Sequence, residues 1–296
     1  MNHIKAFSKE TTKMQTIRQV LNEAVVKLQN SSSDSPKLDA KLLLMKACSL
    51  SQVQLMVHDN EPISQEQLQA FNELLEQRLI GHPIAHLLGE RDFWDLTLKV
   101  TPDTLIPRPD TEVLVEQALK LIESNKQSKV LDLGTGSGAI IIALKHTVPS
   151  ISAFAVDKSP GALQVAQENA RRYDLEVNFN LGSWFEPLQE HYQHYFDVIV
   201  SNPPYIEEED EHLQRGDVRF EPLSALVSGK DGLDDIRLIA SQAISYLTKD
   251  GFLLFEHGYN QGPAVVSILT DLGYRQVQTI KDYGNNDRVT LGQAPA

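Results

Sequence analysis

The chain has 296 residues, which is enough for two domains of ordinary size. Its 40 acidic residues outnumber its 27 lysines and arginines, and the formal net charge of −13 argues against a protein that grips nucleic acid by its phosphates. A basic protein partner or a small molecule suits this charge better.

The single cysteine, Cys48, cannot form an intrachain disulfide, and no cluster of Cys and His has zinc spacing. Residues 1–13 are polar and charged, without an apolar signal core, and no apolar run has the length of a membrane span. We therefore expect a cytoplasmic protein that binds neither a metal nor a membrane.

Helical periodicity runs over residues 16–91, where apolar residues recur three and four positions apart. Ser64 and Gln67 form a capping pair that opens one of these helices, and Gly81 ends it. We expect a small N-terminal helical domain over residues 1–92.

Residues 93–100 alternate between apolar and polar, and residues 101–110 are interrupted by prolines. This pattern predicts a short hairpin or an extended joint over residues 93–109. A helix is expected from about Asp110, which opens the third segment, residues 110–296.

Strands and helices alternate from Lys129 onward, as in βαβ units, and this predicts a parallel sheet with helices on both faces. The last two strands are joined by a short turn and should pair as an antiparallel hairpin at the sheet edge. The expected strands are residues 130–133, 151–156, 177–181, 196–200, 252–255, 274–280 and 288–291. One helix is expected to start at residue 139. Three more are expected over residues 162–173, 233–247 and 261–272.

A glycine-rich turn follows the first of these strands and consists of Gly134, Thr135, Gly136, Ser137 and Gly138. Such glycines let a ligand approach the backbone and the N-terminus of the next helix. Asp157 ends the second strand, where an acid can hold ribose hydroxyls. Gly134, Gly136 and Ala139 also satisfy the dinucleotide pattern, so a nicotinamide dinucleotide and S-adenosylmethionine both remain open as cofactors.

The segment Asn202, Pro203, Pro204 and Tyr205 follows the fourth strand. The prolines remove two backbone donors and stiffen the chain, and a residue before a proline is extended. The side-chain carbonyl of Asn202 and a neighbouring backbone carbonyl can then accept both hydrogens of one –NH2 group, on which the Tyr205 ring can stack. For such a segment alone, a simple turn is the more common interpretation.

Open parallel sheets bind ligands at strand ends, near the point where the strand order reverses. We expect the fourth strand beside the first, which places Asn202 next to the glycine-rich turn. An –NH2 clamp beside an adenosine cofactor suits N-methylation, because two fixed acceptors can turn the amide lone pair toward a sulfonium methyl group. No strong base is needed beforehand, since the methylated nitrogen is very acidic.

These motifs resemble the HemK-type protein-(glutamine-N5) methyltransferases, which modify peptide chain release factors. The resemblance runs from about Thr16 to nearly the end of the chain. It rests on LIPRPDTE at residues 105–112, VLDLGTGSG at 130–138, NPPY at 202–205, GDVRFEP at 216–222 and RVT at 288–290.

The resemblance implies a Rossmann-like, S-adenosylmethionine-dependent methyltransferase fold behind an N-terminal helical substrate-recognition domain. The acceptor would be the glutamine of the Gly-Gly-Gln motif in class 1 peptide chain release factors. Many family members have an acid where this chain has Ser183, so a contact from that side chain to adenine is not implied. S-adenosylmethionine would be bound by Gly134, Thr135, Gly136, Ser137, Gly138, Asp157, Trp184 and Asn202. The glutamine would be bound by Asn202, Pro203, Pro204 and Tyr205, with Asn202, Pro203 and Tyr205 as the catalytic residues.

Some residues near these motifs have simpler structural interpretations. Without the resemblance, Trp184 is more typical of a core, and the five acids of residues 207–211 are typical of a solvated loop. Arg108 and Asp110 could close the site from the joint, but a surface pair is the more common interpretation. Arg219 and Glu221 are likewise open between loop structure and substrate contact, with loop structure favoured. Glu256 and His257 are expected to form a structural hydrogen-bonded pair.

Two other functions compete. An N6-adenine DNA or RNA methyltransferase could use the same clamp, but the net charge and the lack of a basic stripe disfavour it. A non-catalytic binding module is disfavoured by the intact Asn202 and glycine-rich turn. We expect a monomer without direct nucleic-acid contact.

Overall fold

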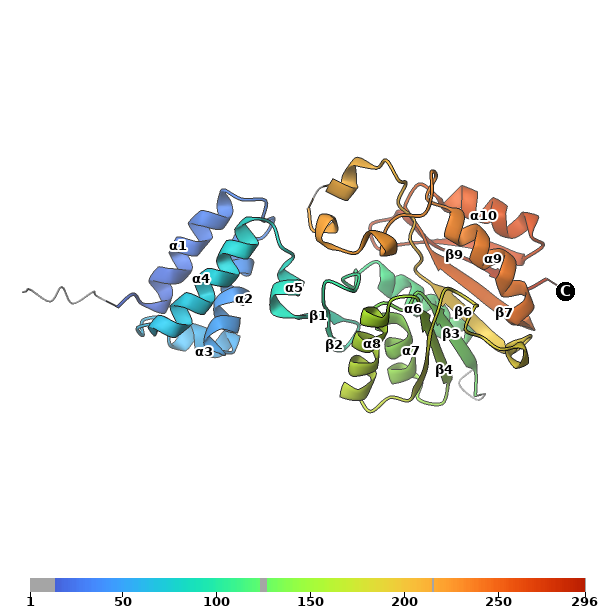
Figure 1. The fold of residues 1–296 in the computed structure, drawn as a ribbon, viewed down its shortest axis with the longest axis horizontal. Helices are drawn as coiled ribbons and strands as arrows, with labels where there is room; N and C mark the ends of the chain where they lie inside the picture. The colour runs from blue at the N-terminus through green and yellow to red at the C-terminus, as the bar shows by residue number, and fades with distance from the viewer. Residues whose placement is uncertain (1–13, 123–126, 215, 296) are drawn as a thin grey trace, which may run out of the picture. The chain divides into compact units, whose positions relative to one another are not determined.

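The computed structural model describes residues 14–122, 127–214 and 216–295. The polar start, residues 1–13, lies outside them. Two compact units divide between Leu88 and Gly89 (Figure 1). Each unit has its own core, since one apolar cluster is confined to the first unit and two others to the second.

The first unit consists of the helices α1 (Ile17–Gln29), α2 (Pro36–Cys48), α3 (Gln52–Val57), α4 (Gln65–Leu79) and α5 (Ile84–Leu88). Reciprocal capping boxes begin α1, α3 and α4 at Thr16, Ser51 and Ser64. The predicted helix start at Ser64 is therefore confirmed. Arg78 Nε of α4 lies 2.7 Å from Asp39 Oδ2 of α2, and this buried ion pair joins the two helices.

The second unit begins with an antiparallel hairpin and continues as a seven-stranded sheet of order β5-β4-β3-β6-β7-β9-β8. The hairpin strands are β1 (Glu90–Phe93) and β2 (Leu96–Lys99). The sheet strands are β3 (Lys129–Leu133), β4 (Ser152–Asp157), β5 (Val177–Leu181), β6 (Phe196–Ser201), β7 (Leu247–Glu256), β8 (Arg275–Lys281) and β9 (Asp287–Gln293). The helices are α6 (Thr111–Leu121), α7 (Ala139–Thr147), α8 (Pro160–Arg172), α9 (Asp234–Tyr246) and α10 (Gly262–Asp271).

The sheet is covered on both faces, as its side chains show. Along β3, Val130 packs with residues of α6 and α7, whereas Leu131 packs with residues of α9 and α10. Along β6, Val198 belongs to the cluster that contains residues of α6 and α7, and Ile199 belongs to the cluster that contains residues of α9 and α10. This alternation is what a buried strand requires when helices lie on either side.

The strand order places the ends of β3 and β6 side by side. They pair in parallel from Val130 opposite Val198 to Leu133 opposite Ser201. The expected position of the fourth strand beside the first is confirmed. The antiparallel pairing of β8 with β9 is also confirmed, with β8 at the edge.

Three local features differ from the sequence-based expectation. Strand β7 begins at Leu247 rather than at residue 252, and its register with β6 shifts between Phe196 and Val198 because a polar, glycine-containing stretch is accommodated there. The short helices α3 and α5 were not expected, since neither is long enough to show a period. Within the described ranges, no helix has the length and apolar character needed to cross a membrane.

Candidate active site

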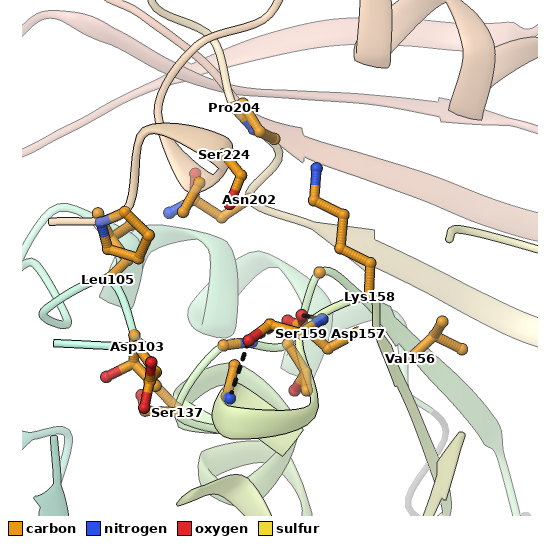
Figure 2. Close-up of a pocket in the computed structure, with 18 of the residues that line it drawn as sticks. Asp103, Leu105, Ser137, Val156, Asp157, Lys158, Ser159, Asn202, Pro204 and Ser224 are labelled. Atoms are coloured by element: carbon orange, nitrogen blue, oxygen red, sulfur yellow. Dashed lines mark hydrogen bonds between the residues drawn. The ribbon is translucent and has the colours of Figure 1, made fainter. Parts of the chain in front are cut away.

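A cavity opens in the second unit at the carboxyl ends of β3, β4 and β6 (Figure 2). Its empty space is about 1080 Å³, including the part open to solvent. In Figure 2, Asn202 and Pro204 lie in the upper part of the view, with Ser137, Asp157 and Ser159 in the lower part. The walls also include the joint before α6 and the loop that follows β6.

The backbone of the turn after β3 is hydrogen-bonded to the end of β4. Gly134 N and Thr135 N both donate to Val156 O, at 2.9 and 3.1 Å. Gly136 has a φ of +57°, which favours glycine, and a Cβ built there meets no atom within 4 Å. Because Gly136 also lines the cavity, a ligand can approach its backbone closely.

Gly138 has a different role from the other glycines of this turn. It does not line the cavity. Its φ is +83°, and a Cβ there would lie 2.7 Å from Ile142 Cδ1 and 3.2 Å from Ala166 Cβ. Gly138 therefore allows α7 and α8 to pack closely, which is the usual reason for the last glycine of such a turn.

The carboxylate of Asp157 is held by two backbone donors at the cavity. Oδ2 accepts from Gly136 N and Oδ1 from Ser159 N, both at 2.8 Å. Each oxygen of an ionised carboxylate has about two lone-pair positions, so both keep room for a ligand hydroxyl. The position fits the expected ribose contact.

Asp132, one strand away, is a buried acid that the sequence analysis did not single out. Its Oδ2 accepts from Thr135 Oγ1 at 2.6 Å, and burial raises the pKa of Asp132 to about 7. The charge of Asp157 raises this pKa as well, whereas the Thr135 hydroxyl lowers it. Asp132 thus holds the glycine-rich turn through Thr135, and its burial favours the protonated form.

Trp184 belongs both to the core and to the cavity wall. Its ring covers Gly134, since a Cβ on that glycine would lie 3.2 Å from Trp184 Cζ3. Trp184 Nε1 donates to Asp235 Oδ1 at 3.2 Å, which fixes the ring. Ser183 also lines the cavity.

Asn202 and Pro204 border the cavity directly after β6. Asn202 Nδ2 donates to Thr111 Oγ1 at 3.4 Å, whereas the buried Oδ1 has no hydrogen-bond partner among the described residues. A buried acceptor left without a donor costs ~1–3 kcal/mol. A ligand N–H group placed at this oxygen would offset that cost.

Pro203 and Tyr205 do not line the cavity in this structure. The backbone of Tyr205 is fixed, because its N donates to Leu226 O at 3.2 Å and its O accepts from Gln261 Nε2 at 2.9 Å. Burial, and then the charge of Glu256, raise the pKa of the Tyr205 phenol. The phenol is therefore neutral at ordinary pH.

Arg108 and Asp110 do not pair with each other, so the expected surface pair is wrong. Arg108 Nη2 contacts Glu221 Oε1 and Oε2 at 2.9 and 2.8 Å, and Ile106 N donates to the same carboxylate at 3.3 Å. Asp110 instead pairs with Arg288 at 3.3 Å. Arg108 therefore pairs with the buried Glu221, 113 positions away, while Arg288 pairs with Asp110.

The expected pair of Glu256 and His257 is also wrong. The His257 ring contacts Thr290 Oγ1 through Nε2 at 2.8 Å and Gly258 O through Nδ1 at 2.9 Å. Consecutive residues of an extended backbone point to opposite sides, so the two side chains cannot meet.

Several other residues that line the cavity were not predicted, because their positions depend on contacts between segments that are distant in the sequence. Lys158 and Ser159 follow Asp157 directly, so proximity to that acid was a usable signal. Ile140, Val156, Ala162 and Gly182 also line the cavity. The others come from the two proline-containing segments that flank it, and part of these segments belongs to the LIPRPDTE and GDVRFEP motifs. These residues are Pro102, Asp103, Thr104, Leu105, Pro107, Thr111, Pro222, Ser224 and Ala225.

Comparison with known proteins identifies the family. The PrmC N-terminal domain family matches residues 19–89, and a methyltransferase domain family matches residues 124–284. A release factor glutamine methyltransferase of Vibrio cholerae is 49% identical over 282 residues, covering 94% of this chain and 96% of the relative. The protein of the same name from Escherichia coli is 46% identical over 274 residues, covering 92% and 97%.

Solved structures support the fold. A 16S ribosomal RNA methyltransferase of Thermus thermophilus aligns with a TM-score of 0.52 at 18% identity, covering 69% of this chain and 49% of the other. Such low identity shows a shared architecture alone. The curated relatives, by contrast, are identical at nearly half of the aligned positions over almost the whole chain. This chain belongs to the family of release factor glutamine methyltransferases.

Proposed function

We propose that this chain transfers a methyl group from S-adenosylmethionine to the side-chain amide nitrogen (N5) of the glutamine in the Gly-Gly-Gln motif of class 1 peptide chain release factors. The proposal rests above all on the buried Asn202 Oδ1, which has no partner within the described part of the chain. This oxygen is the complement of an –NH2 group. The prolines after it present no N–H that would compete for the same acceptor.

The cavity fits S-adenosylmethionine as cofactor. Gly136 leaves space for a close approach to its backbone, and Asp157 keeps acceptor capacity for ribose hydroxyls. Trp184 supplies an apolar ring at the wall. The residues that would hold the cofactor are Gly134, Thr135, Gly136, Ser137, Asp157, Trp184 and Asn202. When bound, S-adenosylmethionine supplies an electrophilic methyl group on a positively charged sulfur.

The side chains at the cavity act on the acceptor amide by positioning it. Asn202 Oδ1 and a backbone carbonyl of the same segment accept its two N–H bonds, which turns the nitrogen lone pair out of conjugation and favours positive charge on nitrogen. The neutral Tyr205 phenol is not a base in this scheme. The nitrogen, once methylated, releases one proton to solvent, so no residue has to remove it beforehand.

The charge pattern supports a protein substrate. Five acids at residues 207–211 follow the clamp, and they would repel the phosphates of a nucleic acid. We infer a monomeric cytoplasmic enzyme whose N-terminal domain, residues 1–92, recognises the release factor outside the Gly-Gly-Gln loop.

Labelled methyl transfer tests the function directly. Incubation with methyl-labelled S-adenosylmethionine and either a class 1 release factor or DNA should label only the release factor, at the Gly-Gly-Gln peptide. Label on DNA would support the N6-adenine alternative instead. An absence of label on both, from a protein that binds the cofactor, would indicate a non-catalytic binding module.

The cofactor is tested separately by calorimetry. We expect binding of S-adenosylmethionine and none of NAD(H), because the clamp lies beside the glycine-rich turn and no group for hydride chemistry was found in the sequence. Tight NAD binding without S-adenosylmethionine binding would contradict the methyltransferase mechanism.

A further inference from the structure

A buried carboxylate lies beside Asn202. Glu256 ends β7, which pairs in parallel with β6 so that Ser201 lies opposite Phe255. The next residues along the chain, Asn202 just after β6 and Glu256 at the end of β7, therefore come together at the same sheet edge. Glu256 is 1% exposed, and its Oε2 has no hydrogen-bond partner among the residues described. The mechanism proposed above gives this acid no part.

Thr111, at the start of α6, links the two side chains. Its Oγ1 accepts from Asn202 Nδ2 at 3.4 Å. Burial raises the pKa of Glu256 to about 7, but hydrogen bonds from Thr111 and from Asn202 favour the ionised form. The amide nitrogen of Asn202 thus faces both the hydroxyl and the carboxylate.

This arrangement can select one of the two amide orientations of Asn202. An ionised carboxylate only accepts hydrogen bonds, so it requires the nitrogen of a neighbouring amide and rejects its oxygen. When the Thr111 hydroxyl donates its hydrogen to the carboxylate, it can only accept a hydrogen bond from Asn202. It therefore also requires the amide nitrogen, which is the donor, to face it. Both neighbours therefore leave Oδ1 for a ligand.

We propose that Glu256 is a positioning residue that, together with Thr111, fixes the amide orientation of Asn202 and so presents its oxygen to the substrate –NH2 group. The inference rests on the proposed glutamine methylation. Glu256 does not touch the reacting atoms, because it acts through Asn202.

Three charged or titratable groups face Glu256 from the neighbouring elements. Arg288 of β9 stabilises the carboxylate, Asp110 before α6 opposes it, and Tyr205 after β6 lies close enough for its own pKa to be raised by Glu256. Arg288 is in turn divided between Asp110 and Asp282, at 3.3 and 3.1 Å. Protonated Glu256 would be a donor and would no longer reject the Asn202 oxygen, so turnover should fall as the pH drops below about 7.

Glu256→Gln tests this role without changing the shape of the side chain. A glutamine amide both donates and accepts, so it selects neither orientation of Asn202. We expect kcat to fall on the order of 10–100-fold, since small misplacements in an active site have effects of this size. The KM for the release factor and the affinity for S-adenosylmethionine should stay within about twofold, and the acidic limb of the pH profile near 7 should disappear. A kcat within about twofold of wild type would overturn the proposal.

Asp282→Asn is the matched control, because it alters the same Arg288 cluster without a contact to Asn202. It should lower the thermal stability and leave kcat at the pH optimum unchanged, and it should keep an acidic limb in the pH profile, which moves to lower pH because Arg288 is freed to stabilise the Glu256 carboxylate. If Asp282→Asn lowered kcat as much as Glu256→Gln, a general loss of packing would explain both, and the positioning role would be wrong.

A double-mutant cycle separates positioning from structure. In an Asn202→Ala background, Glu256→Gln should lower kcat by no more than about twofold, because the side chain that it positions is absent. If the kcat losses of the two single variants multiplied in full in the double variant, the proposal would be overturned. Thr111→Val serves in the same cycle if Glu256→Gln fails to fold. Wild-type protein that left release factors unmethylated would refute the proposed function itself, whereas active wild type with fully active variants would refute only the positioning role.

Discussion

The amide oxygen of Asn202 is the acceptor on which the proposed chemistry depends. Asn202→Ala removes this oxygen at a strand end, outside the apolar clusters, so the fold should survive. We expect kcat to fall on the order of 10²–10³, by analogy with the loss of one fixed donor in an oxyanion hole. Cofactor affinity should fall less, because Asp157 and the glycine-rich turn remain. Single-turnover methylation, with cofactor binding measured separately, gives both numbers, and near-wild-type turnover would mean that the segment is only a turn.

Asn202→Asp separates the acceptor from the rest of the amide. The carboxylate keeps an acceptor oxygen but adds charge beside Glu256 and removes the donor to Thr111. We expect partial activity, higher than that of Asn202→Ala, in the same single-turnover assay. Activity no higher than that of Asn202→Ala would show that an acceptor oxygen alone at this position does not support turnover.

Two glycines of one turn should respond differently to the same substitution. Gly138→Ala places a methyl group 2.7 Å from Ile142 Cδ1 at positive φ, so it should lower the free energy of unfolding by about 1–3 kcal/mol. Gly136→Ala shares the cost of positive φ but meets no protein atom within 4 Å, so it should destabilise the fold less and should weaken S-adenosylmethionine binding by about tenfold or more, where the ligand approaches the backbone. Denaturant unfolding and calorimetry on both variants check this, and equal effects of the two would contradict the assignment of Gly138 to helix packing.

At the scale of elements, β3 contains an acid that ties sheet stability to pH. The pKa of Asp132 is raised by burial to about 7 in the folded chain, above its ordinary value, so folding favours the protonated form. Its contribution to stability is fully present below the unfolded pKa, near 4, and is lost as the pH rises through about 7. Between pH 4 and pH 8, wild type should therefore lose at least about 1 kcal/mol of unfolding free energy relative to Asp132→Asn. A constant difference between the two proteins across this range would contradict the raised pKa.

The elements themselves were largely predictable because their signals are local. The capping pair at Ser64 and the alternation along β3 and β6 depend on residues a few positions apart. The start of β7 at Leu247 was not predictable, since the polar stretch that follows resembles a turn and is strand only because β6 accommodates it.

The site was predictable in part for the same reason. The glycine-rich turn, Asp157 and Asn202 lie at the ends of recognisable strands. The partners of Asn202 and Arg108 are Thr111 and Glu221, which are 91 and 113 positions away, and no local pattern indicates such pairs. The helix-packing role of Gly138 could not be predicted, because the sequence does not show that Ala166 of α8 lies against it.

At the scale of the molecule, each unit has its own apolar core, which suggests separate roles. Deletion of residues 1–88 should leave S-adenosylmethionine binding within about threefold, because the cavity lies wholly in the second unit. Methylation of a folded release factor should weaken strongly, since a specific protein interface buries ~800 Å² per partner, more than one glutamine can offer. Full activity of the truncated protein on the intact factor would show that the first unit is not a recognition domain.

The N–H of Ile106 should report the opening of the cavity wall. It donates to the Glu221 carboxylate, 115 positions away, so its exchange with solvent deuterium requires this contact to open, which can happen while the sheet stays intact. We expect Ile106 to exchange before Leu131 in β3, and to slow when S-adenosylmethionine is added. Exchange of both amides at one common rate would mean that the wall opens only on global unfolding. If the cofactor enters through this wall, the opening rate of a single amide sets an upper limit on how fast the enzyme can renew its methyl donor.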